Sequence, residues 1–152
     1  MVILVSACLL GLPTRYDGGH SCHTGVMSLS KKHLLIPVCP EQLGGLPTPR
    51  PPCERAGGLV LDQAGTDKTA AFVSGAEAAM KIYKLCGCEA AVLKARSPSC
   101  GKGLVYDGSF SGKLTNGNGV FSDLLEKNAC PVYTEDEIDM LLQTLKEDGS
   151  PG

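Results

Sequence analysis

A thiol and a carboxylate stand two residues apart in the segment "IPVCPEQLGG", residues 36–45. Cys39 ends an apolar run, and Glu41 follows it after a single proline. A cysteine thiolate can bind a metal ion, and a nearby carboxylate can take a proton from a reacting group. The spacing predicts a chemical site at the end of a strand, although Glu41 in isolation also fits a solvated loop residue.

The chain has 152 residues, eight cysteines and a formal net charge of −2, a balance that does not favour an extended nucleic-acid surface. Its apolar first residues lack the basic start of a signal peptide, and no run approaches the roughly 20 apolar residues of a membrane span. We therefore expect a cytoplasmic protein, in which disulfides are disfavoured and cysteines serve metal binding, catalysis or burial. A zinc ribbon is not expected because the sequence contains no CxxC pair.

Strands and helices alternate along the chain, which predicts a mainly parallel sheet with helices on both faces, a three-layer α/β fold in a single domain over residues 1–152. The expected strands are 2–7, 34–38, 90–95 and 131–134, with a weaker one at 58–62. The expected helices are 24–33, 67–87, 119–129 and 134–148. The strands 2–7, 34–38 and 90–95 are expected to be buried on both faces. Residues 40–57, with five prolines, and 97–118 are expected to be loops without regular structure.

Three cysteines stand where predicted strands end. Cys8 follows the first strand, Cys39 ends the second, and Cys100 lies in the loop after residues 90–95. Because parallel strands end at one edge of their sheet, we expect these three thiols to meet there. They would bind zinc with an open fourth position, or an iron–sulfur cluster with one iron lacking a protein ligand. Burial as small core residues is the simpler alternative.

Several motifs together resemble the thiouracil desulfidase family. They are "VSACLLG" (5–11), "RYDGGH" (15–20), "PVCPEQLGGLPTPRPPCE" (37–54), "LKARSPSCG" (93–101) and "YDGSFSG" (106–112). The resemblance runs from residue 2 to about residue 135. It implies a Rossmann-like fold, a 4Fe–4S cluster on Cys8, Cys39 and Cys100, and catalytic roles for Glu41 and Ser97.

The activity that this resemblance implies is hydrolytic, non-redox removal of sulfur from thiolated uracil compounds, with release of sulfide. The open iron would capture the substrate sulfur as a Lewis acid, and Glu41 would act as the base for the attacking water. The expected ligand is a small thiolated pyrimidine base, nucleoside or nucleotide. A non-catalytic metal- or nucleotide-binding module at the same edge, and a structural protein with buried thiols, are the rival hypotheses.

Further polar residues in the long loops are weaker candidates for substrate binding. They are Tyr16, Asp17, Arg50, Lys102, Tyr106 and Asp107. The tyrosines and aspartates offer hydrogen bonds to a pyrimidine or ribose, and the two cations offer partners for a phosphate. A Ser-His-Asp triad is not expected, since no histidine has an organised relation to Ser97.

Overall fold

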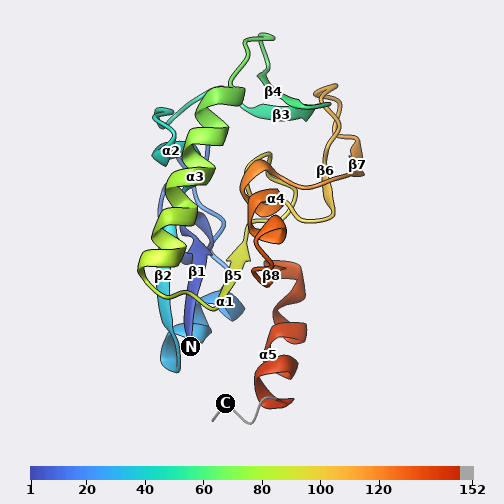
Figure 1. Ribbon diagram of the computed structural model, residues 1–152. Helices are drawn as coiled ribbons and strands as arrows, with labels where there is room; N and C mark the ends of the chain where they lie inside the picture. The colour runs from blue at the N-terminus through green and yellow to red at the C-terminus, as the bar shows by residue number, and fades with distance from the viewer. Residues whose placement is uncertain (148–152) are drawn as a thin grey trace.

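A four-stranded parallel sheet forms the centre of the computed structural model, which describes residues 1–147. Its strands are β1 (Val2–Ser6), β2 (Leu34–Val38), β5 (Ala90–Leu93) and β8 (Val132–Thr134). They stand in the order β2-β1-β5-β8, and each neighbouring pair is parallel (Figure 1). The predicted α/β fold with a mainly parallel sheet is confirmed.

Helices cover both faces of this sheet (Figure 1). They are α1 (Thr24–Ser28), α3 (Thr69–Leu85), α4 (Val120–Lys127) and α5 (Ile138–Glu147). Alternate side chains of β1 separate the two cores. Leu4 packs in a cluster with residues of α3 and α4, whereas Ile3 and Val5 pack in a second cluster with residues of α1 and α5. The three layers therefore follow from the two-residue period of a strand buried on both faces.

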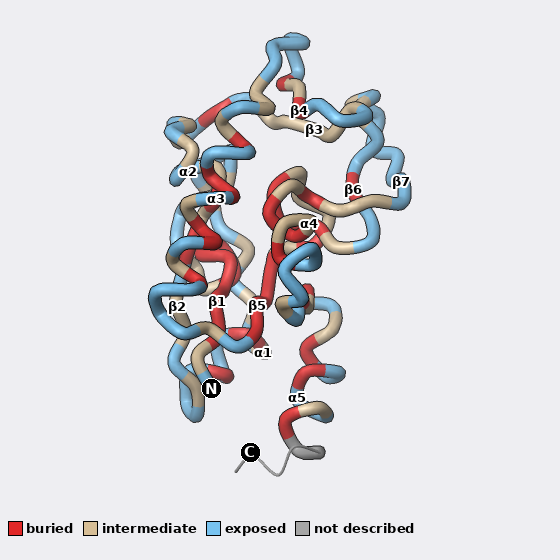
Figure 2. Tube along the Cα trace, viewed as in Figure 1, coloured by how far each residue is buried: buried red, intermediate tan, exposed pale blue. Residues whose placement is uncertain are grey.

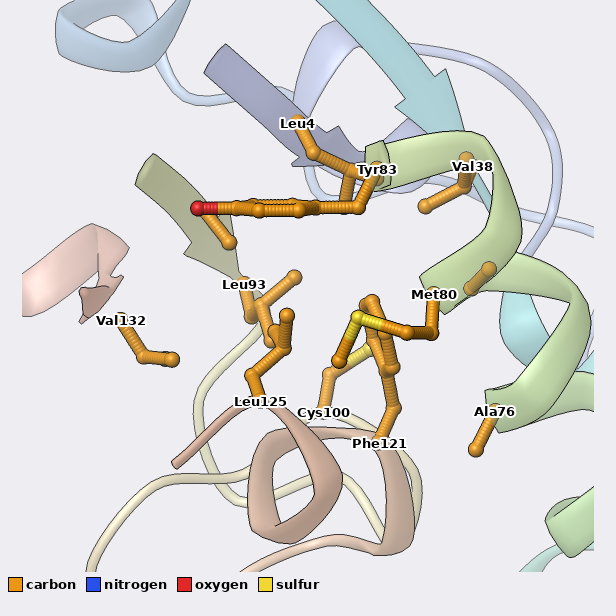
Figure 3. Packing of buried hydrophobic residues seen from close by; sticks show 12 residues of the cluster. Leu4, Val38, Ala76, Met80, Tyr83, Leu93, Cys100, Phe121, Leu125 and Val132 are labelled. Carbon is orange, nitrogen blue, oxygen red and sulfur yellow. The ribbon is translucent and has the colours of Figure 1, made fainter. Parts of the chain in front are cut away.

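The core between the sheet and α3 and α4 reaches the carboxyl edge of the sheet. Tyr83 and Met80 of α3 face Phe121 and Leu125 of α4 across it (Figure 3). Cys100 belongs to the same cluster and is 3% exposed. Cys100, a predicted metal ligand, is therefore packed into the end of the core, and this packing restricts its movement.

The expectation that β2 is buried on both faces is wrong. β2 is an edge strand with β1 as its neighbour (Figure 2), and Leu34 is 62% exposed. The central strand β1 is buried from its second residue onward. Only the last residue of β2, Val38, is fully buried, and this residue immediately precedes Cys39. The part of β2 that carries the predicted site is therefore the part that is held in the core.

The proline-rich segment 40–57 contains regular structure, contrary to expectation. It forms the short helix α2 (Pro40–Leu43) and the strand β3 (Cys53–Ala56). Proline suits the first turn of a helix, where its missing N–H is not required, so Pro40 starts α2 rather than preventing it. β3 pairs antiparallel with β4 (Leu59–Asp62), so the predicted weak strand at 58–62 lies outside the parallel sheet.

The segment 97–118 also contains an unexpected hairpin, β6 (Leu104–Tyr106) and β7 (Leu114–Asn116). This hairpin and the β3–β4 pair lie beyond the carboxyl ends of β1 and β5 (Figure 1). Their strands are short and stay separate from the main sheet, which is why the strand periodicity is weak there.

Short turns complete the fold. They are the 3-10 helices η1 (Ala7–Leu10), η2 (Leu29–Lys31) and η3 (Glu135–Glu137). The predicted helix 134–148 is divided into η3 and α5, and Glu137 accepts a hydrogen bond from the Thr134 backbone N–H at 3.0 Å. Residue 148 lies outside the described residues. Within residues 1–147, no helix has the length and apolar character needed to cross a membrane.

Candidate functional site

Cys8, Cys39 and Cys100 line one pocket of about 500 Å³ at the carboxyl edge of the sheet. Cys8 lies in the turn that follows β1, Cys39 directly follows β2, and Cys100 lies in the loop after β5. These strands are neighbours in the sheet, so their ends bring together residues that are 31 and 61 positions apart in the chain. The volume suits a small molecule.

The three thiols are free; Cys8 and Cys100 are buried, and Cys39 is half-buried. Burial raises the pKa of Cys8 to about 11 and that of Cys100 to about 12, and it also raises the pKa of Cys39. The thiols also affect one another: Cys39 raises the pKa of Cys8, and both raise the pKa of Cys100. Without a metal all three are protonated near neutral pH, so metal binding must displace their protons.

Nearby cations and hydrogen-bond donors partly offset the rise in thiol pKa that burial causes. Lys94 lowers the pKa of Cys8, and Arg50 lowers that of Cys39. The Ser6 side chain hydrogen-bonds to Cys100 and lowers its pKa. The pocket is therefore prepared to hold three thiolates once a positive centre replaces the protons.

Cysteines can hold two kinds of metal centre, a single ion or an iron–sulfur cluster. In the described part of the chain, no three His, Cys, Asp or Glu side chains are grouped closely enough to hold one metal ion. The thiolate ligands of an iron–sulfur cluster each bind a different iron, so they stand farther apart than the ligands of one zinc. The three thiols that line the pocket are of the ligand type that iron–sulfur clusters use.

Glu41 projects from α2 into the same pocket wall, and both of its carboxylate oxygens have partners. The Nε–H of Arg50 donates to Oε1 at 3.0 Å, and the hydroxyl of Ser99 donates to Oε2 at 2.9 Å. The Glu41 side chain is 13% exposed. It is therefore an oriented carboxylate beside the thiols, and the reading as a freely solvated loop residue is wrong.

Ser97 and Ser99 continue this network toward Cys100. Their hydroxyl oxygens are 3.0 Å apart, and the Ser97 hydroxyl accepts backbone N–H groups from Ser99 and Cys100 at 3.2 and 3.0 Å. Ser99 thus connects Ser97 to Glu41. A proton or a polar substrate group that reaches any of these side chains meets a continuous chain of donors and acceptors.

The start of α4 fixes the loop that carries Cys100. Phe121 donates its backbone N–H to the Ser99 carbonyl at 2.8 Å, and Gly119 donates to the Gly101 carbonyl at 2.7 Å. A Cβ at Gly119 would overlap the backbone of Ser99 and lie 2.6 Å from the Cys100 nitrogen. Only glycine allows the loop and the helix to approach this closely.

The weaker substrate-binding candidates separate into two groups. Tyr16, Tyr106 and Arg50 line the pocket. Arg50, however, is buried and its guanidinium donates to protein acceptors, including the Thr14 carbonyl at 2.9 Å, so it shapes the wall more than it offers a site for phosphate.

The other three candidates do not line the pocket. Lys102 forms an ion pair with Glu137 at 3.0 Å. Asp17 and Asp107 instead accept local turn hydrogen bonds from Gly19 and Ser109.

Several wall residues were missed by the sequence analysis. Ser99 and Lys94 fall inside the "LKARSPSCG" motif, and Glu54 and Phe110 fall inside two others, so motif membership was the available signal. Cys53 also lines the pocket, and burial raises its pKa to about 11.

The remaining cysteines lie elsewhere. Cys22 is exposed and contacts the Met27 sulfur at 3.0 Å. Cys88 and Cys130 pack against the core under α3 and α4, and Cys86 is exposed at the end of α3. None of these four lines the described pocket.

Comparison with known proteins agrees with this geometry. The sequence model of the 2-thiouracil desulfurase family matches residues 3–137. An uncharacterized protein of Bacillus subtilis (strain 168), YbbK, is 36% identical over 151 residues, which cover 93% of this chain and all of that protein. A solved structure described as a [4Fe-4S]-dependent thiouracil desulfidase, TudS, has 42% identity and a TM-score of 0.86, with coverage of 95% of this chain and 97% of that one.

Proposed function

The chain belongs to the 2-thiouracil desulfurase family, and we propose that it removes sulfur from thiolated uracil compounds by hydrolysis. In the net reaction a thiocarbonyl and water give a carbonyl and hydrogen sulfide, and no electrons are transferred. The observation that carries the proposal is the meeting of three free thiols, two of them buried and one half-buried, and an oriented carboxylate in one pocket.

Cys8, Cys39 and Cys100 would hold a 4Fe–4S cluster. Two observations support this assignment: these thiols influence one another's pKa, and the similar solved structure is described as [4Fe-4S]-dependent. Three protein ligands would leave one iron of such a cluster without a protein ligand. When bound, the cluster supplies a soft Lewis acid for the sulfur of the substrate.

Glu41 would take a proton from the water that attacks the carbon. Arg50 and Ser99 hold its two oxygens, so the carboxylate is kept in one orientation. Such preorganisation reduces the entropy lost in reaching the transition state. As the carbon–sulfur bond breaks, the new carbon–oxygen bond becomes the carbonyl, and the sulfur leaves as hydrosulfide.

Ser97 and Ser99 would orient the polar groups of the substrate and pass protons to and from Glu41. Their hydroxyl oxygens are 3.0 Å apart, and each group can donate and accept. Arg50 is a positioning residue in this scheme. Its Nη2 also lies 3.9 Å from the sulfur of Cys39, so a single guanidinium faces both the base and one proposed cluster ligand.

The substrate would be a thiolated pyrimidine base, nucleoside or nucleotide. A pocket of about 500 Å³ is within the usual range for small-molecule sites. Its wall includes the cationic residues Arg15, Lys94 and Arg96. Assays that compare 4-thiouracil, 4-thiouridine and its monophosphate would identify which form is preferred.

The decisive experiment is purification and reconstitution without oxygen, followed by a sulfide-release assay with 4-thiouracil and 4-thiouridine monophosphate. We expect brown protein with about four irons per chain. Colourless protein that contains stoichiometric zinc would instead favour the non-catalytic metal-binding module.

Two variants test the roles within the site. Glu41→Gln keeps the size of the side chain, so we expect it to retain the cluster and lose sulfide release by about 100-fold or more. Cys53→Ser is the matched control in the same wall, and we expect it to retain both iron and activity. Normal turnover by Glu41→Gln would overturn the assignment of the base.

A further inference from the structure

We propose that Phe110 is the surface on which the pyrimidine ring of the substrate stacks, and that Glu54 holds Phe110 in place. The inference rests on the proposed function, because it assigns how the same pocket binds the ring. Phe110 lies in the loop between β6 and β7, lines the pocket and is half-buried. Its position brings an aromatic side chain from the hairpin to the wall of the pocket that holds the thiols.

The backbone of Phe110 has an unusual conformation. Its φ is +56°, in the left-handed region that side chains with a Cβ rarely adopt. Such conformations persist where the surrounding structure enforces them, and they concentrate at binding sites. Arg96, with φ +65°, is a second non-glycine residue of this kind, and it also lines the pocket.

Glu54 supplies the contacts that enforce this conformation. Its Oε1 accepts the backbone N–H groups of Gly108 at 3.0 Å and of Phe110 at 3.1 Å. Glu54 belongs to β3, which is more than 50 positions away in sequence, and it also lines the pocket. A Cβ at Gly108 would lie 2.8 Å from the Arg55 carbonyl oxygen, so the loop rests directly on β3. One carboxylate therefore fixes the loop on both sides of Ser109.

Phe110 suits this role better than the two tyrosines of the wall. Tyr16 is 40% exposed, and the guanidinium of Arg15 lies over its ring at 5.8 Å. Tyr106 is 36% exposed. Phe110 has no polar group and is less exposed, which favours contact with the flat face of a heteroaromatic ring.

A fluorescent variant tests ring stacking directly. The chain contains no tryptophan, so Phe110→Trp places a single tryptophan in the pocket wall, and its emission can be excited selectively over that of the four tyrosines. We expect saturable quenching when uracil or uridine monophosphate is added, both to the full-length chain as purified and after anaerobic cluster loading. Leu85→Trp, at a 75% exposed position at the end of α3, is the control and should show no saturable quenching. Absence of quenching in Phe110→Trp would overturn the proposal.

Steady-state kinetics of the loaded enzyme provide a second test. Stacking of a base on an aromatic side chain is strong enough that Phe110→Leu should raise the KM for 4-thiouracil by about 5- to 100-fold. The separate variant Phe110→Tyr keeps an aromatic ring, so its KM should equal that of the natural chain. An unchanged KM in a folded Phe110→Leu protein would contradict the stacking role.

Glu54 is a positioning residue, and its test depends on a conservative rescue. Glu54→Ala should raise KM as Phe110→Leu does, with kcat much less affected, and Glu54→Gln should rescue KM because its amide oxygen still accepts both N–H groups. In a Phe110→Leu background, Glu54→Ala should add little, since both changes remove the same platform. Independent, additive effects on KM would overturn the link between the two residues.

The outcomes separate this inference from the proposed function. Quenching of Phe110→Trp by uracil in a chain that releases no sulfide would support the platform and reject the activity. Sulfide release by the natural chain with unaltered KM in Phe110→Leu would support the activity and reject the platform.

Discussion

The Nε atom of Arg50 lies 3.0 Å from Oε1 of Glu41, and the two side chains are only 4% and 13% exposed. The guanidinium also donates to Pro47, Thr48 and Thr14, which links the proline-rich segment to the loop after β1. The ion pair therefore orients the proposed base and also joins two segments that enclose the pocket.

Breaking the Arg50–Glu41 ion pair should destabilise the folded protein. Arg50→Gln leaves the Glu41 carboxylate nearly buried without its cation, so we expect the free energy of unfolding to fall by about 3–5 kcal/mol. Urea denaturation measures this change. The control is Lys127→Gln, which removes an exposed pair with Asp123 at 3.7 Å and should cost about 1 kcal/mol or less. Equal effects of the two substitutions would show that the buried pair has no special role.

The two serines should act as one unit. Ser99→Ala removes the donor to Glu41 Oε2, and a hydrogen bond to a charged group of this kind corresponds to a fall in kcat of about 10- to 100-fold. Ser97→Ala interrupts the same chain one step further away. In a double-mutant cycle on kcat, we expect the double variant to lose little more than Ser99→Ala alone. Additive losses would indicate that the two hydroxyls work separately.

Much of this site follows from strand direction, which the sequence pattern predicts. The ends of β1, β2 and β5 place Cys8, Cys39 and Cys100 at one pocket, as expected for parallel strands. The order of the strands is a property of long-range pairing that local periodicity does not encode. For that reason the apolar run of β2 was expected to be buried, although Leu34 is exposed at the sheet edge.

The polar network was less predictable, because it depends on how irregular segments turn. Arg50 reaches Glu41 only because the chain folds back after α2, and Glu54 reaches Phe110 across two separate strand pairs. Nothing in the spacing of these residues indicates such contacts. Ser99 was overlooked for a different reason: the motif resemblance pointed to Ser97, two residues away.

Close approach of α2 to α3 should make the position of Glu41 sensitive to a single methyl group. A Cβ at Gly75 in α3 would overlap the carbonyl oxygen of Pro40, the first residue of α2. Gly75→Ala must therefore push α2 away, and we expect a loss of about 1–3 kcal/mol in the free energy of unfolding together with reduced kcat. Gly58→Ala is the control, because its Cβ would meet no atom within 4 Å. Thermal unfolding and sulfide release measure the two effects.

The buried thiols should also react in a pH-dependent order. Burial raises the pKa of both Cys8 and Cys53 to about 11 from an ordinary value of 9.0, whereas Cys22 and Cys86 are exposed. Iodoacetamide attacks the thiolate, so Cys22 and Cys86 should be alkylated first in metal-free protein at pH 8. The rate at Cys8 and Cys53 should then rise about tenfold per pH unit until about pH 11. Peptide mass spectrometry after timed labelling gives the order.

Cluster loading should change the alkylation of Cys8 but not that of Cys53. Cys8 should become protected at every pH because its sulfur is bound to iron, while Cys53 should keep its metal-free reactivity. In the metal-free protein the raised pKa of Cys53 also makes the free energy of unfolding depend on pH. The protonated thiol stabilises the folded state fully below pH 9, and this stabilisation is lost as the pH rises to about 11. Equal protection of Cys8 and Cys53 on loading would mean that Cys53 occupies the fourth ligand position, which would remove the open iron on which sulfur binding depends.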